Sequence, residues 1–133
     1  MNCSNNGLDT RRKILSLDDA ETATKTSRPL RVIAGHFDPL TATHARGIQR
    51  KPDGRVLVIV TDPPDPILSL SARAELVAAL DAVDYVVSAM DNTSAEIIAR
   101  LQPDDVTQEE AADLRRTEDL VAHVKARQIA KET

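Results

Sequence analysis

The stretch RVIAGHFDPLTATH, residues 31–44, contains the features that decide the fold. It opens with a short apolar run, passes through Gly35 and leads into a segment that carries His44. An apolar run followed by glycine and a helix-starting segment is typical of a buried strand, a turn and a helix. The first turn of a helix has unpaired backbone N–H groups and a positive dipole end, both suited to phosphate. The stretch therefore predicts a strand–turn–helix unit that can bind phosphate.

Apolar runs of the same kind recur along the chain. Residues 30–34, 56–60 and 85–87 are largely apolar rather than alternating, which is typical of strands covered on both faces. Residues 103–106 could form the stub of a fourth strand. Capping patterns and apolar spacing predict helices over residues 17–25, 71–80 and 93–101, and a last helix capped by residues 107–110 and running to Lys131.

This alternation of strands and helices predicts an α/β fold. We expect a Rossmann-like open parallel sheet of three to four strands, with flanking helices and right-handed crossovers. In such sheets the ligand crevice lies beyond the carboxyl ends of the strands. Residues 35–44 and the proline-rich residues 61–66 both follow strand ends, so both are expected to border that crevice.

Composition excludes several classes of protein. A chain of 133 residues fits one domain, and we expect a disordered leader over residues 1–12 and a single domain with a C-terminal helix over residues 13–133. The net charge of -4 and an aromatic set of only Phe37 and Tyr85 disfavour nucleic-acid binding. No apolar run approaches the roughly 20 residues that cross a bilayer. We therefore expect a cytoplasmic protein with neither a membrane nor a nucleic acid as partner.

Within the opening stretch each unusual side chain has a predicted place. Gly35 permits a close approach of another group to the backbone. Phe37 is expected to pack as an anchor under the loop, and Asp38 to brace the loop. Thr41 and His44 are three residues apart and share a face on a helical first turn. For His44 the alternative to a catalytic role is a helix cap or a surface position.

Other polar side chains have plainer interpretations. His36 is expected to face solvent from the loop, and Asp62 to cap a loop rather than to contact a ribose or a metal. Arg73 is expected to form a surface ion pair with Glu75 or Asp81, with a place near the ligand as the alternative. Arg115 and Arg116 alternate with acidic residues, as on a solvated helix face. The inner side of the last helix, against the sheet or a second subunit, is expected to carry Leu114, Val121 and Val124.

The opening motif resembles the signature G-x-F-D-x-x-[HT]-x-G-H of the cytidylyltransferase-like nucleotidyltransferase superfamily. Thr41 in place of the first histidine is similar to the phosphopantetheine adenylyltransferase variant of that signature. A longer resemblance is to the adenylyltransferase domain that makes ADP-heptose. Residues 13–17, 73–87 and 93–104 carry it, so the resemblance covers about residues 13 to 105.

The resemblance implies a fold, a reaction and a site. The fold would be a truncated nucleotidyltransferase fold. A phosphate oxygen of the acceptor would attack the α-phosphate of ATP or CTP, and pyrophosphate would leave. His44 and Thr41 would be the catalytic residues, donating hydrogen bonds to the phosphates. The nucleotide site would be lined by Gly35, His36, Phe37, Asp38 and Thr43. The family implies Mg²⁺, but none of these residues is a predicted metal ligand.

Departures from the signature leave alternatives open. Thr43 stands where the signature has glycine, residues 61–68 lack lysine and arginine, and the later Ser/Thr-rich phosphate motif is absent. The leading hypothesis is transfer of AMP or CMP to a phosphorylated small-molecule acceptor. A second is a catalytically degenerate relative that acts as a nucleotide-binding or protein-interaction module. A third is a subunit whose last helix pairs with a partner, for which a homo-oligomer is one form.

Overall fold

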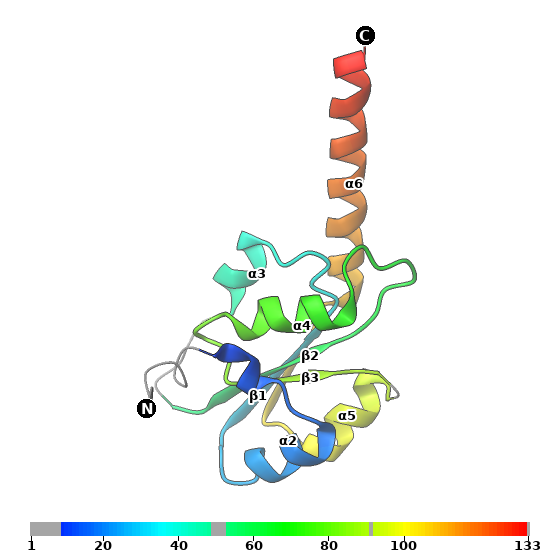
Figure 1. Cartoon of the computed structure of the whole chain (residues 1–133). Coiled ribbons are helices and arrows are strands. Elements are labelled where there is room, and N and C mark those ends of the chain that lie inside the picture. The colour runs from blue at the N-terminus through cyan, green and yellow to red at the C-terminus, as the bar shows by residue number, and fades with distance from the viewer. Residues whose placement is uncertain (1–8, 49–52, 91, 133) are drawn as a thin grey trace.

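A single parallel sheet organises the chain (Figure 1). The structure, a computed structural model, describes residues 9–48, 53–90 and 92–132. Within these residues four parallel strands lie in the order β3-β2-β1-β4. They are β1 (Leu30–Gly35), β2 (Arg55–Val60), β3 (Tyr85–Ser88) and β4 (Asp105–Gln108). The predicted Rossmann-like α/β sheet is confirmed, and its fourth strand is present.

Helices cover both faces of the sheet, as the continuously apolar strands predict. The helical elements are η1 (Thr10–Lys13), α2 (Leu17–Thr24), α3 (Ala42–Gly47), α4 (Leu70–Ala78), α5 (Ser94–Leu101) and α6 (Glu110–Glu132). On one face α4 packs Val77 against Ile33 and Val58. On the other, α2 and α5 pack against Val32 and Leu57. Register aligns Gly35 with Val60 and Val60 with Ser88, so these strands end level with one another.

Most helix starts follow the capping patterns of the sequence. Ser16, Thr41, Ser69 and Thr93 each accept a hydrogen bond from the backbone N–H three residues ahead. The expected cap at residues 107–110 is wrong, because Thr107 lies in β4 and α6 begins at Glu110. Residues 105–108 pair instead with the edge of β1 that β2 leaves free. The Glu109 N–H then donates to the Ala34 carbonyl at 2.7 Å.

Both ends of the chain differ from the sequence-based picture. Residues 1–8 of the expected leader lie outside the described residues, and residues 10–12 belong to η1. At the other end α6 runs out beyond the body of the molecule (Figure 1). Leu114 and Val121 are half-buried, but Val124 is 56% exposed, so the sheet does not cover Val124, and cover by a second subunit stays a prediction. None of the described helices combines the length and apolarity needed to cross a bilayer.

Candidate functional site

The turn after β1 aims two backbone N–H groups at one point. Phe37 has a φ of 51°, a left-handed conformation that is uncommon for a residue other than glycine. The N–H groups of His36 and Phe37 both donate to Oδ2 of Asp113, at 2.9 and 3.3 Å. Asp113 lies in the first turn of α6. The group at the predicted phosphate position is therefore a carboxylate of the chain itself.

His44 reaches the same carboxylate from α3. The Thr41 N–H donates to Nδ1 of His44 at 3.0 Å, and the Thr41 hydroxyl lies 2.9 Å from the same nitrogen. Because Nδ1 accepts a hydrogen bond, the neutral ring carries its proton on Nε2. Nε2 then donates to Oδ1 of Asp113 at 2.5 Å. Thr41 thus acts as a helix cap that fixes the tautomer and orientation of His44.

Asp113 collects these donors in an almost fully buried position. It is 1% exposed, and Arg116 adds a hydrogen bond of 2.6 Å to Oδ1. Burial by itself raises the pKa of Asp113, but the hydrogen bonds from His44 and from the N–H groups of Phe37 and His36 outweigh it and hold the pKa below its ordinary value. The arrangement is an anion site with charge-assisted hydrogen bonds, occupied by Asp113.

Gly35 makes this approach possible. A Cβ atom at position 35 would lie 2.6 Å from Oδ2 of Asp113 and 3.0 Å from the ring of Phe37. Phe37 is fully buried, and its ring centre lies 4.9 Å from that of His44. The close approach expected at Gly35 is therefore made by the carboxylate of α6.

Asp38 braces a neighbouring loop, and Thr43 lines a hollow beside His44. Asp38 is buried and accepts hydrogen bonds from the N–H groups of Ile67 and Leu68, at 2.7 and 2.8 Å. It braces the loop between β2 and α4 and does not reach the anion site. Thr43 is exposed on α3, where it borders a hollow of about 240 Å³ that Glu109 and Arg116 also line.

Arg73 is fully buried, so the expected surface ion pair is wrong. Its guanidinium donates to the carbonyls of Thr61 at 2.7 Å, His36 at 3.0 Å and Leu68 at 3.1 Å, and it pairs with Asp62. The turns after β1 and β2 leave these carbonyls without strand partners, and the planar fork of arginine satisfies them together. Arg73 supports the loops around the site from beneath.

His36 was expected to face solvent, and this is also wrong, because the side chain is buried. Its Nδ1 lies 3.0 Å from the hydroxyl of Thr61. The ring borders a second hollow, of about 350 Å³, at the carboxyl ends of β1, β2 and β3. Asp62, Thr93 and Ser94 line this hollow as well. It occupies the crevice position that the sheet topology predicts for a ligand.

Asp113 and Arg116 are the site residues that the sequence did not reveal. They lie about 75 residues beyond the opening motif, on a helix whose charges read as a solvated face. The signal available was their spacing of three residues, which puts both on one side of a helix. No local pattern in the sequence shows that β4 pairs with β1 and so places the first turn of α6 beside the carboxyl end of β1.

A divalent cation does not fit this cluster as it stands. His44, Glu109 and Asp113 offer ligand atoms within 4.8 Å of one another. The guanidinium of Arg116, however, lies 2.6 Å from Asp113 and 3.7 Å from Glu109 and already neutralises these carboxylates. Mg²⁺ prefers carboxylate oxygens and water in octahedral geometry, so the described residues do not form a site for it.

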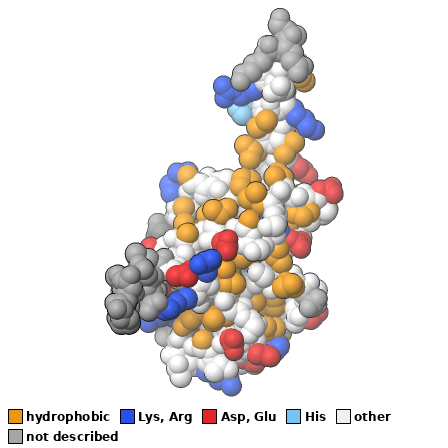
Figure 2. All heavy atoms as spheres, viewed as in Figure 1, with side chains coloured by type: hydrophobic (Ala, Val, Ile, Leu, Met, Phe, Trp, Pro, Cys, Tyr) orange, Lys and Arg blue, Asp and Glu red, His pale blue; other side chains and the backbone are white. Residues whose placement is uncertain are grey.

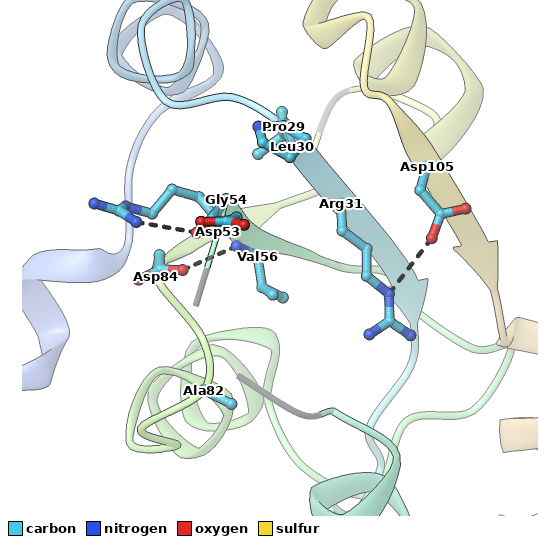
Figure 3. Close-up of a pocket in the computed structure, with 10 residues that line it drawn as sticks. Pro29, Leu30, Arg31, Asp53, Gly54, Val56, Ala82, Asp84 and Asp105 are labelled. Carbon is cyan, nitrogen blue, oxygen red and sulfur yellow. Dashed lines mark hydrogen bonds and ion pairs between the residues drawn. The ribbon is translucent and has the colours of Figure 1, made fainter. Parts of the chain in front are cut away.

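A third hollow lies at the opposite end of the sheet and has a structural explanation (Figure 3). It measures about 110 Å³. Asp84 accepts a hydrogen bond from the Val56 N–H at 2.9 Å, and Arg31 lies 3.7 Å from Asp105. These side chains hold the amino ends of the strands. The candidate functional site is therefore the one at the carboxyl ends.

Comparison with known proteins adds no relative. Neither a scan of protein-family models nor a search of curated proteins finds a match to this chain. The opening motif and the geometry around His44 are therefore the features that indicate a function.

Proposed function

We propose that the His44 site binds a phosphate group of ATP or CTP, and that the chain is a relative of the cytidylyltransferase-like nucleotidyltransferases. One observation supports this above the others. The N–H groups of His36 and Phe37, Nε2 of His44 and the guanidinium of Arg116 all donate to a single carboxylate. Backbone N–H groups, imidazole and guanidinium are the donors that proteins use for phosphate oxygens.

The proposed reaction transfers AMP or CMP to a phosphorylated small-molecule acceptor. A phosphate oxygen of the acceptor bonds to the α-phosphorus, the bond from that phosphorus to the bridging oxygen breaks, and pyrophosphate leaves. His44 Nε2 and the backbone N–H groups would stabilise negative charge on the phosphates as it develops. For this the phosphate must displace the carboxylate of Asp113 from the same donors.

The second candidate is a relative without catalytic activity. Two observations favour it: Asp113 fills the anion site with a complete set of hydrogen bonds, and residues 61–68 contain no lysine or arginine. In that case the hydrogen bonds of Asp113 hold α6 against the turn after β1, and no ligand displaces the carboxylate. The chain would then serve as a binding or interaction module.

Calorimetric titration with ATP and CTP, with and without Mg²⁺, separates the two. The enzyme proposal predicts binding by the unmodified chain, and pyrophosphate release across a panel of sugar phosphates that is lost in His44→Ala. Asp113→Asn removes the competing charge and is expected to tighten nucleotide binding. Asp119→Asn removes an exposed carboxylate from the same helix and controls for net charge.

The outcomes are distinct. Turnover that depends on His44 supports the enzyme. Binding confined to Asp113→Asn, without turnover, supports the module. Absence of nucleotide binding in both folded proteins contradicts the phosphate site itself.

A further inference from the structure

The part of α6 that leaves the body carries an apolar face. Leu114, Val121 and Val124 lie at helical spacing, and Figure 2 shows hydrophobic side chains gathered along the base of the projecting helix. Between α6 and the proline-rich loop runs a groove of about 480 Å³, lined by Pro63, Pro64, Leu114 and Val121. Ile67 at its rim is 55% exposed. This is an apolar groove that the described chain leaves uncovered.

Along α6 the groove is bordered by a negative charge first and a positive charge two turns later. Glu118 and Lys125 both line it, and they lie seven residues apart, two helical turns along the same side of α6. A twofold axis near residues 121 and 122 would exchange these two positions between copies. Glu118 of each copy would then lie beside the partner's Lys125, and the Val121 side chains of the two copies would lie near the axis. The face is complementary to itself only in the antiparallel direction.

We propose that α6 pairs with α6 of a second copy, antiparallel, through this groove. A parallel pairing would set each Glu118 level with the partner's Glu118 and bring both globular bodies to the same end. In the antiparallel pairing the bodies lie at opposite ends, and the end of each helix enters the partner's groove. That end carries Lys125 and Arg127, and the groove carries Asp65 and Glu118. The second copy therefore matches the groove in both shape and charge.

Light scattering and sedimentation over a concentration series test the pairing. The unmodified chain is expected to shift from monomer to dimer as its concentration rises. Glu118→Lys or Lys125→Glu alone should weaken the dimer by about tenfold, because each reverses two symmetry-related ion pairs. The double swap should restore the dimer. Asp119→Lys makes the same charge change at an exposed position outside the groove lining, about 100° around α6 from Glu118, and should leave the dimer unchanged.

Each result decides the matter. A chain that stays monomeric at the highest concentration reached overturns the proposal. So does a dimer that is indifferent to both single swaps, or one that the double swap fails to restore. Val121→Glu, checked for helix content by circular dichroism, should abolish the dimer without unfolding the body.

Discussion

Asp113 joins segments that are far apart in the sequence. Its carboxylate binds the turn after β1 through two backbone N–H groups and α3 through His44. Gly35 leaves the space in which that carboxylate lies. One small residue and one charged residue thus set the geometry of the site together.

Replacing Gly35 by alanine should disrupt this contact. The new Cβ would lie 2.6 Å from Oδ2 of Asp113, so the turn or the first turn of α6 must move. We expect a loss of about 1–3 kcal/mol in the free energy of unfolding, measured with urea. Gly47→Ala is the matched control, because a Cβ there meets nothing within 4 Å, and it should be neutral or stabilising by about 1 kcal/mol. Equal effects of the two changes would contradict this account.

The sequence predicted some of these side chains better than others. Asp38 was expected to brace the loop, and it does so through Ile67 and Leu68. Arg73 was expected to form a surface ion pair because it starts a helix and has the acidic Glu75 and Asp81 nearby in the sequence. Its burial depends on loop carbonyls from two other segments, which no local pattern shows.

Among the helices and strands, α4 has a second task besides covering the sheet. Arg73 projects from its first turn and holds the carbonyls after β1 and β2. Strand and helix positions were predictable because the apolar runs and the capping hydroxyls are local. β4 was harder, since Val106 is its only apolar residue and its pairing is made with an edge of β1 about 75 residues away.

Arg73→Met should loosen both loops. Removing the guanidinium leaves buried carbonyls without donors, and we expect a loss of about 3 kcal/mol or more in the free energy of unfolding. Arg73→Lys should recover only part of it, because an ammonium group lacks the planar fork. Arg115→Met, at an exposed position on α6, is the control and should be near neutral. Complete rescue by lysine would show that charge alone matters at this position.

The molecule as a whole is a small sheet with one long helix leaving it (Figure 1). The sheet and its order follow from a chain that alternates strands and helices. The direction of α6 does not, because its apolar residues are few and its charges are mixed. The contacts of Asp113 and the short link to β4 fix its first turn against the turn after β1.

Global stability should reflect the ionisation of Asp113. Its folded pKa is lowered, so its contribution is complete above the unfolded value of about 3.9 and is lost as the pH falls through the folded pKa. The free energy of unfolding in urea should therefore be higher for the unmodified chain than for Asp113→Asn at neutral pH. The difference between the two free energies should become smaller below about pH 4, where the carboxylate of Asp113 begins to be protonated. A difference that stays constant with pH would show that Asp113 does not titrate differently on folding.

The pairing of β1 with β4 also bears on how the chain folds. Of the strands that the structure describes, β1 is synthesised first and β4 last. Until residues 105–108 are made, one edge of β1 has unpaired N–H and C=O groups, the kind of edge that invites aggregation. Contacts of this long sequence separation also slow folding. The segment that brings Asp113 to the turn after β1 is therefore the same segment that protects the nascent sheet.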